Sequence, residues 1–396
     1  MSKLDKLINE LCPNGVKYEA LGELGKFHGG LTGKSKDDFT DGNATFITYK
    51  NVYSNPALNI NPDDIVKIAE GENQRTLEYG DVVFTGSSET PDECGFSSIV
   101  TKKPEKLLYL NSFCFFFRFD DSNIIEPDFA KHLFRSQSLR YQIGKTASGV
   151  TRFNVSKDKM AKVIIPIPHI EIQREIVRIL DNFTELTAEL TAELTARKKQ
   201  YKYYCSKILS FRDIPDVKWL TLNKIANVFR GDYITKKGTL EGSVPVILGG
   251  QEPAYYIDKS NHNGKIVVIA RSGASAGFVS YWDEPIFVTD GFGYEAKTDI
   301  VDEKYLYYSL KSIEPELNAM KRGAGVPHVS GEAIGKIQLP VPCIEEQKRI
   351  VAILDRFDTL CNDISSGLPA EIEARQKQYE YYRDKLLTFP KVELEV

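Results

Sequence analysis

The chain has 396 residues, of which 42% are hydrophobic, 27% charged and 11% aromatic, a composition typical of a globular protein with two or three domains. Its 51 Lys and Arg against 55 Asp and Glu give a net charge of −4, and this balance by itself argues against a nucleic-acid-binding protein. No apolar run could span a membrane and the first residues show no signal-peptide pattern, so we expect a soluble, cytoplasmic protein.

Residues 1–165 are predicted to form a first domain. Short β-type runs at 81–85 and 113–119 are separated by Gly, Asn, Asp and Ser turns, and one helical stretch follows at 126–143. The six cysteines of the chain are scattered singly, without a zinc-ligand spacing, so we expect neither a structural zinc nor a disulfide framework. This pattern predicts a mixed α+β domain.

Residues 166–211 are predicted to form one long helix. The segment opens with Pro-x-Pro and then carries apolar residues three and four positions apart, as at Ile172, Ile176 and Ile179. Thr-Ala-Glu-Leu occurs twice in succession at 187–194. A helix of about 40 residues would be a rod of roughly 60 Å.

The remaining chain repeats this order. Residues 212–339 hold β-type runs at 244–248, 265–270 and 286–289 and a helical stretch at 302–321, and residues 340–396 return to the helical pattern with a C-terminal tail. In that last region, Gly and Pro within Ser365–Pro369 should interrupt the rod, because proline cannot donate the helical hydrogen bond.

An internal duplication explains the order. The helical segments match position by position, as in the pairs Pro166/Pro340, Gln173/Gln347, Asp181/Asp355, Gln200/Gln378 and Tyr204/Tyr382. The domains match more faintly: Gly30 falls opposite Gly231, and we align 147–150 with 323–326. We therefore predict two homologous α/β domains separated by two long antiparallel helices, a coiled-coil strut with pseudo-twofold symmetry. Two similar heads at a fixed separation suit the reading of two patches on one linear partner.

The sequence resembles the specificity subunit of type I restriction-modification enzymes. The resemblance rests on the Pro-x-Pro blocks that begin at Pro166 and Pro340, each followed by Gln-x-x-Ile-Val-x-Ile-Leu-Asp-x-Phe. It also rests on Arg-x-Lys-Gln-Tyr-x-Tyr-Tyr at 197–204 and 375–382, and on the Thr-Ala-Glu-Leu units. It covers the whole chain, with the helices matching more strongly than the heads.

This resemblance implies a non-catalytic subunit that recognises double-stranded DNA. Each head would read one half of a bipartite target, and the helices would set the spacer and dock two modification subunits that methylate adenine. Two motor-nuclease subunits would complete the complex. The chain itself would hold no cofactor or metal, since S-adenosylmethionine, ATP and magnesium would be bound by the partner subunits.

Candidate DNA contacts come from basic and small-residue loops. Residues 131–162 hold eight Lys and Arg against one Asp, a density that would supply salt-sensitive affinity for phosphate. Arg152 and Arg271 are the candidates for base contacts, because arginine is the commonest reader of guanine. The candidates in the first domain are Lys34, Lys36, Ser87, Arg140, Lys145, Ser148 and Arg152. Those in the second are Arg230, Tyr233, Lys236, Arg271, Ser272, Lys321, Arg322 and His328.

Two other functions stay open at this level. One is a protein–protein scaffold that does not touch DNA. The other is a metal-dependent nuclease, for which Asp283 or Asp290 with Glu295 and Lys297 gives a loose pattern that the first domain lacks. The sequence has no phosphate-binding loop of the Gly-x-x-x-x-Gly-Lys-Ser/Thr type, and its Asn-Pro dipeptides lack the second proline and the aromatic residue of an amino-methyltransferase motif.

Overall fold

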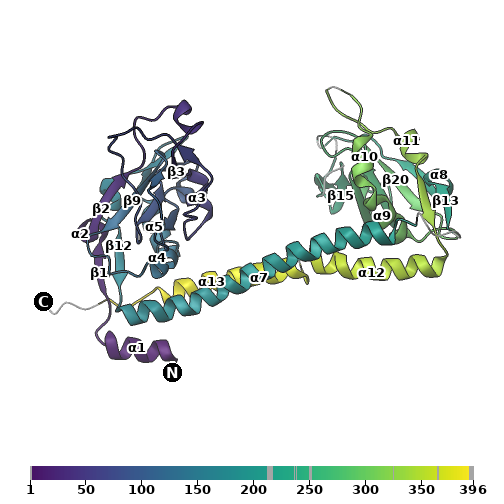
Figure 1. Ribbon diagram of the computed structural model, residues 1–396. Coiled ribbons are helices and arrows are strands. Elements are labelled where there is room, and N and C mark those ends of the chain that lie inside the picture. The colour runs from purple at the N-terminus through teal and green to yellow at the C-terminus, as the bar shows by residue number, and fades with distance from the viewer. Residues whose placement is uncertain are drawn as a thin grey trace. The chain divides into compact units, whose positions relative to one another are not determined.

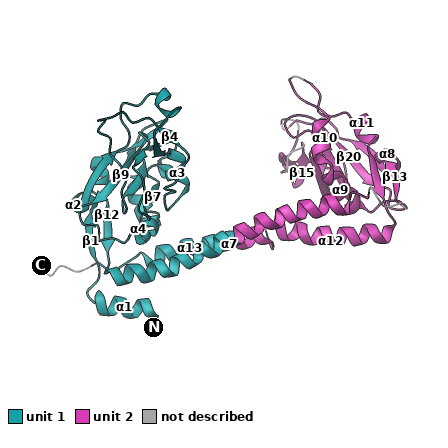
Figure 2. Cartoon of the chain, in the orientation of Figure 1, with its two compact units in different colours: residues 1–189, 372–396 teal, residues 190–371 magenta. Residues whose placement is uncertain are grey.

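The computed structural model describes residues 2–211, 217–235, 237, 239–248, 252–323, 325–363 and 365–391. The chain forms two compact units (Figure 2). Unit 1 comprises residues 1–189 and 372–396, and unit 2 comprises residues 190–371. Each unit therefore contains one predicted domain together with parts of both predicted helical regions.

Unit 1 contains short strands and helices, followed by the first part of a long helix (Figure 1). In chain order its elements are α1 (Lys3–Leu11), β1 (Lys17–Ala20), α2 (Leu21–Leu24), β2 (Gly25–Gly29), η1 (Lys36–Phe39), β3 (Ala44–Ile47), α3 (Tyr49–Ser54), β4 (Ile65–Val66), β5 (Val82–Thr85), β6 (Ser87–Ser88), η2 (Pro91–Glu93), β7 (Ser97–Ile99), β8 (Leu108–Leu110), β9 (Cys114–Phe119), α4 (Pro127–Leu133), α5 (Gln137–Gly144), β10 (Ala147–Ser148), β11 (Phe153–Val155), α6 (Lys157–Met160) and β12 (Ile164–Ile167).

Unit 2 repeats most of this order. Its elements are β13 (Lys218–Thr221), α8 (Leu222–Ile225), β14 (Ala226–Arg230), β15 (Val244–Ile247), β16 (Tyr255–Ile257), β17 (Lys265–Ala270), β18 (Val279–Asp283), β19 (Phe287–Val288), β20 (Gly291–Ala296), α9 (Glu303–Ser312), α10 (Glu314–Ala319), α11 (Gly331–Gly335), β21 (Gln338–Val341) and α12 (Ile344–Asn362). Two helices, α7 (Ile170–Ile208) and α13 (Leu368–Leu386), have residues in both units.

Three sheets of unit 1 recur in unit 2 with the same topology, which confirms the internal duplication, while a fourth, β10-β11-β6, is matched in unit 2 by isolated bridges. Unit 1 has a four-stranded antiparallel sheet in the order β2-β9-β5-β7, and unit 2 has β14-β20-β17-β18. A three-stranded sheet lies in each, β4-β3-β8 and β16-β15-β19, with one antiparallel and one parallel pairing. A third pairing, β1-β12 in unit 1 and β13-β21 in unit 2, joins the start of each domain to the strand before its long helix.

Gly30 and Gly231 hold the same position, as the sequence predicted. The next residue in each unit, Leu31 or Asp232, donates its backbone N–H to the last carbonyl of the parallel strand, Leu110 at 2.7 Å or Val288 at 3.1 Å. A Cβ at either glycine would lie within 2.6 Å of a backbone oxygen, so only glycine permits this approach.

The prediction of one helical stretch at the end of each domain is wrong, because each of these segments forms two separate helices. In unit 1, α4 ends at Leu133 and α5 begins at Gln137, after Ser136 takes an extended conformation. In unit 2, α9 ends at Ser312 and α10 begins at Glu314. Proline in the first turn of α10, at position 315, cannot donate a hydrogen bond to the preceding turn.

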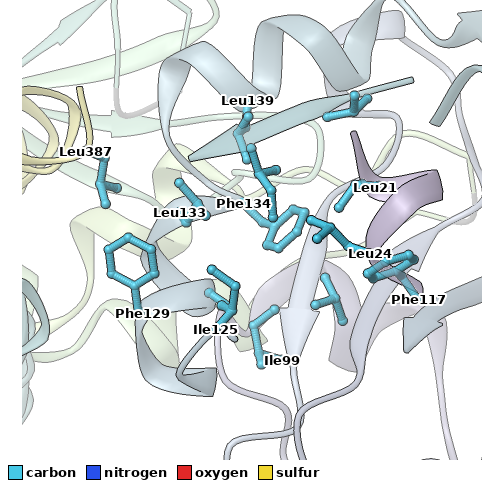
Figure 3. Close-up of a cluster of buried hydrophobic side chains, with 14 of the residues drawn as sticks. Leu21, Leu24, Ile99, Phe117, Ile125, Phe129, Leu133, Phe134, Leu139 and Leu387 are labelled. Atoms are coloured by element: carbon cyan, nitrogen blue, oxygen red, sulfur yellow. The ribbon is translucent and has the colours of Figure 1, made fainter. Parts of the chain in front are cut away.

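The core of unit 1 lies between its four-stranded sheet and the helices that cover it. Strand β9 contributes the buried Phe117, and α4 contributes Phe129 and Leu133 (Figure 3). Ile172, Ile176 and Leu180 of α7 are also fully buried in this cluster, four residues apart, so they lie on one face of the helix. The long helix is thus an integral part of the fold of the unit, since one of its faces completes the core.

The two helical regions run antiparallel, as predicted. Within unit 1, Phe183 of α7 stacks on Tyr382 of α13, with ring centroids 5.4 Å apart. Within unit 2, Tyr201 and Tyr204, which come later in α7, lie beside Phe357 of α12, with ring centroids 6.1 and 5.9 Å apart. Since α12 precedes α13 in the chain, later residues of α7 meet earlier residues of its partner.

The predicted interruption of the second helical region is confirmed. Helix α12 ends at Asn362 and α13 starts at Leu368, whereas α7 continues for 39 residues (Figure 1). A Cβ at Gly367 would lie 2.4 Å from the carbonyl oxygen of Thr359, so the close turn between the helices requires glycine. Among the described residues, none of the helices combines the length and the apolar character of a membrane span.

Candidate nucleic-acid interface

A corner beside strand β5 in unit 1 brings together three segments that are distant in sequence. The backbone N–H of Gly86 donates to the carbonyl of Phe113 at 2.8 Å, and the carbonyl of Gly86 accepts from the N–H of Val155 at 2.9 Å. Ser87 follows and pairs with Asn154 of β11. Two strand ends and one hairpin therefore meet at Ser87.

Unit 2 builds the same corner from different residues. The N–H of Arg271 donates to the carbonyl of Asp290 at 3.0 Å, and the carbonyl of Arg271 accepts from the N–H of Val329 at 2.9 Å. Ser272 follows and forms a bridge to His328. Arg271 thus takes the place of Gly86, and Asp290 the place of Phe113. We call the sites at Ser87 and Ser272, with their hydrogen-bonded neighbours, the serine corners.

An arginine lies at the serine corner of unit 1. The Nε and Nη2 atoms of Arg152 donate to Oγ of Ser87 at 3.1 and 2.9 Å, and the guanidinium lies 5.6 Å from the ring centroid of Phe113. Arg152 is exposed, whereas Ser87 is buried with 6% of its surface accessible. The corner therefore anchors part of the guanidinium and leaves its remaining N–H groups available.

The arginine at the serine corner of unit 2 comes from another strand. Arg271 directly follows β17, and its Nη1 lies 3.9 Å from Oδ1 of Asp290. The other carboxylate oxygen of Asp290 bonds to the hydroxyl of Ser272. Arg271 is 41% exposed. A distance of 3.9 Å is an ion pair without a hydrogen bond, so the donors of Arg271 are not used up by Asp290.

A depression opens beside each serine corner. In unit 1 a cavity of about 530 Å³ is lined by Ser87, Phe113, Arg152, Tyr49, Tyr53 and Glu93, among others. In unit 2 a cavity of about 680 Å³ is lined by Arg230, Tyr233, Leu248, Arg271 and Asp290, among others. Arg230 and Arg271 also line a second depression, together with His328. The predicted residues Arg230, Tyr233, Arg271 and His328 are therefore gathered in one region of unit 2.

The depression of unit 1 contains negative charge as well as Arg152. The carboxylate of Glu93 accepts from Tyr53 at 3.0 Å and from Ser88 at 3.0 Å. These hydroxyl groups lower the pKa of Glu93, which keeps its carboxylate ionised. An ionised carboxylate accepts hydrogen bonds and does not donate them, so this depression can meet amino groups as well as acceptors.

The hairpins beside the two corners show that the predicted alignment of 147–150 with 323–326 is wrong. Ser148 pairs with Asn154 in unit 1, and Arg322 pairs with His328 in unit 2. Gly149 and Gly323 follow with positive φ angles of 153° and 114°, so these two glycines are equivalent. The sequence alignment, which placed Ala147 opposite Gly323, is wrong by two positions, because the loop is too short and too rich in Gly and Ala for residue identity alone to set the register.

The other predicted DNA contacts differ in exposure: some are exposed, and others are bonded within their unit. Lys36, Lys145, Ser148, Tyr233 and Arg322 are exposed. Nζ of Lys34 pairs with Glu72 at 2.6 Å and its side chain is only 9% exposed. Nζ of Lys321 donates to the carbonyl of Ala274 at 2.8 Å. Lys236 lies outside the described residues.

Arg140, predicted as a DNA contact, is instead used inside unit 1. Its guanidinium donates to the carbonyls of Asp92, Cys94 and Gly95 at 2.5–2.7 Å and lies 4.5 Å from the ring centroid of Phe96. Burial lowers the pKa of Arg140. These contacts hold a loop in place inside unit 1, so we do not count Arg140 among the DNA contacts.

Other charges of the 131–162 stretch are also used internally. Arg135 donates to the carbonyls of Ser97, Val52 and Tyr53, and burial lowers its pKa to about 10. Nζ of Lys131 pairs with Asp181 at 2.8 Å. The exposed cations that remain lie before, within and after the hairpin formed by β10 and β11: Lys145, Arg152, Lys157, Lys159 and Lys162.

The candidate nuclease residues do not converge. Nζ of Lys297 donates to the carbonyl of Lys224 at 3.1 Å, and the carboxylate of Glu295 lies 3.5 Å from Nδ1 of His262. Asp290 is bonded to Ser272. Within the described part of the chain, no group of three or more His, Cys, Asp or Glu side chains is arranged to hold a metal ion.

Two members of the serine corners, Phe113 and Asp290, are not predicted by the sequence as DNA contacts. The sequence pattern places Phe113 in a strand and offers Asp290 only as a metal ligand. The available signal was weak: each precedes the strand that pairs with β5 or β17, and Asp-Gly at 290–291 is a turn dipeptide. The hydrogen bonds to Gly86 and Arg271 join residues far apart in the chain, which no local pattern reveals.

The comparisons with known proteins agree with one another. The model of the family described as "Type I restriction modification DNA specificity domain" matches residues 13–197 and again residues 215–374. The specificity subunit of the type I restriction enzyme EcoR124I/EcoR124II of Escherichia coli is 40% identical over 268 residues, which cover 60% of this chain and 66% of that relative. The specificity subunit of the type I enzyme EcoprrI, also of E. coli, is 36% identical over 54% of this chain and 56% of its own length.

The matched region thus spans somewhat less than two thirds of these two relatives. Two solved structures have a similar fold over 94% of this chain. One, from a study of assembly and conformational transition of the type I restriction-modification system, has a TM-score of 0.67 with 19% identity and 97% of that chain covered. The other, the S subunit of a type I system of M. genitalium, has a TM-score of 0.56 with 17% identity and 96% covered.

Proposed function

The chain belongs to the type I restriction modification DNA specificity family, and from this premise we propose that it is the DNA-reading subunit of a type I restriction-modification complex. It is not itself an enzyme. Unit 1 reads one half of a bipartite target through its serine corner, and unit 2 reads the other half through its own. The helical regions hold the two units and set the unspecified spacer between the halves.

The serine corners carry this proposal. Two homologous folds hold the same backbone corner, yet each presents its own side chains there, with an arginine beside a depression in both. Guanine offers two acceptors in the major groove, O6 and N7, and arginine can donate to both at once. A constant backbone with variable side chains is what is needed if two related domains read different sequences.

Contacts to phosphate come from exposed cations of each unit. In unit 1 we assign this role to Lys36, Lys145 and the cations after the hairpin, and in unit 2 to Arg230 and Arg322. Such contacts bind any sequence and weaken with salt, because they release counterions from the duplex. Ser148, Tyr233, Ser272 and His328 are candidates for contacts to bases or sugars at the groove edges.

We assign the protein partners to the helical regions. Tyr203 and Tyr381 occupy equivalent positions and are 58% and 62% exposed, and each has a lysine nitrogen 5.8 Å from its ring centroid. Exposed tyrosines of this kind bury a large area when a partner docks. We propose that two modification subunits bind at the helical regions and that two motor-nuclease subunits complete the full complex. S-adenosylmethionine, ATP and magnesium belong to those partners.

The two alternatives are less well supported. A scaffold without DNA contacts would not need two arginines at equivalent corners. A nuclease would need carboxylates that converge on a metal, whereas Glu295, Lys297 and Asp290 each contact other groups.

Methylation tests the proposal directly. The chain is assembled with its modification subunit and offered a library of random duplexes, and methylated sites are sequenced. We expect one motif with two short specified halves and a fixed gap. Exchange of residues 212–338 for the corresponding head of a relative should then change only one half. Methylation without a motif, or a motif that is not divided, would refute the proposal.

A further inference from the structure

We propose that Phe113 and Asp290 are positioning residues for specificity: each holds the arginine of its own serine corner in the orientation that reads a base pair. The two residues occupy one structural position, since each accepts the backbone hydrogen bond of the equivalent residue after β5 or β17. This inference rests on the proposed function and adds to it the residues that orient the two reading arginines.

The two units place an arginine at the same position from different parts of the fold. Arg152 comes from the segment before β11, whereas Arg271 follows β17. The arginines are therefore not equivalent in the duplicated fold. Both nevertheless lie against the residue in the Phe113/Asp290 position, at 5.6 Å from the ring centroid in unit 1 and 3.9 Å from the carboxylate in unit 2. The Phe113/Asp290 position is therefore shared by the two units, even though the arginine beside it comes from a different segment in each.

Asp290 is held in an unusual conformation. Its φ of 46° lies in the left-handed region, which among the described non-glycine residues only Asp290 and Phe211 adopt. One oxygen of its carboxylate bonds to the hydroxyl of Ser272, while the other is the one nearest to Arg271. The carboxylate is therefore fixed at one end and faces the guanidinium with the other. Such strain at a partly exposed position is a feature of functional sites.

The charge of Asp290 is informative because the partner is DNA. A carboxylate that is 35% exposed beside a duplex repels phosphate, so it weakens affinity for every sequence. Asp290 can offset this loss of affinity by orienting Arg271. A guanidinium that is already restrained by an ion pair loses less rotamer freedom when it donates to O6 and N7 of guanine. An acid in this place therefore favours specificity over affinity.

Phe113 orients Arg152 in unit 1 through the face of its aromatic ring. Phe113 is 57% exposed, and it is the only phenylalanine among the exposed large hydrophobic residues of the described chain. The guanidinium of Arg152 lies over this ring while Ser87 accepts two of its N–H groups. The ring and the hydroxyl together restrict the plane of the guanidinium, and the remaining donors stay free.

The test uses the complex of the full chain with its modification subunit and the random-duplex methylation assay. Asp290→Asn removes the charge, while asparagine accepts the left-handed conformation and can keep the bond to Ser272. Asp290→Gly also suits this φ and removes the side chain altogether. The comparison variant is Arg271→Ala, and the matched control is Asp283→Asn, the same change at an exposed residue of unit 2.

We expect Asp290→Asn and Asp290→Gly to relax the same base-pair position as Arg271→Ala, each by roughly tenfold or more in discrimination. The double variant of Asp290 and Arg271 should lose no more than Arg271→Ala alone, because the aspartate acts through the arginine. Asp283→Asn should leave the motif unchanged. In unit 1, Phe113→Leu should relax the position lost in Arg152→Ala, and Phe113→Tyr should restore it, since tyrosine keeps the aromatic face.

Two results would overturn the inference. In one, Asp290→Asn strengthens binding to all duplexes and leaves the motif intact, which makes Asp290 a plain surface acid. In the other, it alters a position different from that of Arg271, which makes Asp290 a direct base contact. Either result leaves the wild-type bipartite motif in place. Absence of that motif from the wild-type complex would instead contradict the proposed function.

Discussion

Gln173 and Gln347 make the same three hydrogen bonds in the two units. Nε2 of Gln173 donates to the carbonyls of Ile124 and Pro168, and its Oε1 accepts from the N–H of Glu126. Gln347 repeats these bonds with Ile300, Pro342 and Asp302, all at 2.8–3.1 Å. Both side chains are essentially fully buried. Each glutamine therefore connects the first turn of its helix, α7 or α12, to the end of the strand before it and to the loop that enters α4 or α9.

Replacement of Gln173 by Leu should destabilise unit 1 by about 1–3 kcal/mol for each polar group left without a partner. The loss arises because leucine fills the space but cannot satisfy the N–H of Glu126 or the two carbonyls. Hydrogen exchange followed by peptide should show faster exchange in unit 1 for this variant and in unit 2 for Gln347→Leu. The control is Gln338→Leu, at an exposed position of β21, which should stay within about 0.5 kcal/mol.

The stability of unit 1 should fall as pH drops below 6.5. His132 is buried, its Nε2 lies 2.8 Å from Asp181 and its Nδ1 lies 2.8 Å from the hydroxyl of Tyr379. Burial lowers the pKa of His132 below its ordinary value of 6.5, although Asp181 acts in the opposite direction. The unfolded chain therefore takes up a proton as pH falls through 6.5 and the folded chain does not, which favours unfolding.

Thermal unfolding measured between pH 7.5 and 5 checks this, at roughly half-unit steps. In His132→Gln, an amide can still bond to Asp181 and Tyr379, so the decline between about pH 6.5 and 5 should disappear. Lowered carboxylate pKa values, such as that of Glu175 at about 2, act only at lower pH and should be unaffected. Unit 2 is an internal comparison, because Tyr308 bonds to Asp355 in place of the histidine. A decline that persists unchanged in the variant would refute the assignment.

Arg152 and Arg140 should respond differently to the same substitution. Arg152→Ala should keep the fold and lose discrimination at one base pair, at a cost of about 1–3 kcal/mol in binding to the preferred site. Arg140→Ala removes the partner of three carbonyls, so it should lower the unfolding temperature of unit 1 and leave the motif of the surviving complexes unchanged. Methylation-site sequencing and thermal unfolding on both variants separate the two roles. A changed motif in Arg140→Ala would return that residue to the DNA contacts.

Insertion of one more Thr-Ala-Glu-Leu after Leu194 should lengthen α7 by about 6 Å and turn the residues beyond it by about 40°. We expect the gap between half-sites to widen by one or two base pairs without any change in the halves. Sequencing of methylated sites in cells that carry the variant and its partners measures the gap. The same four residues inserted after Gly71, a residue of positive φ with open space around its Cα, should leave the gap unaltered. Altered half-site letters with an unchanged gap would contradict the prediction.

The sequence alone determined the duplication, the long helices and the family. These are linear properties: paired motifs such as Pro166 with Pro340 survive alignment, and a three- and four-residue apolar spacing predicts a helix before any packing is known. The break at Gly367 was also predictable, since glycine and proline act on the backbone where they stand. The sequence also identified the basic loops, but it did not show which of their cations are exposed and which are bonded within the unit.

Only the tertiary structure decided which residues act together. Arg140 and Arg152 look alike in sequence, yet one is surrounded by carbonyls of the 92–95 loop and the other lies exposed beside Phe113. Asp290 meets Arg271 through strand pairing between β17 and β20. Pairings of this kind form because strands distant in the chain bury their apolar faces together, and the polar side chains at the strand ends are then positioned by that packing. The chemistry of the serine corners follows from the packing of the core.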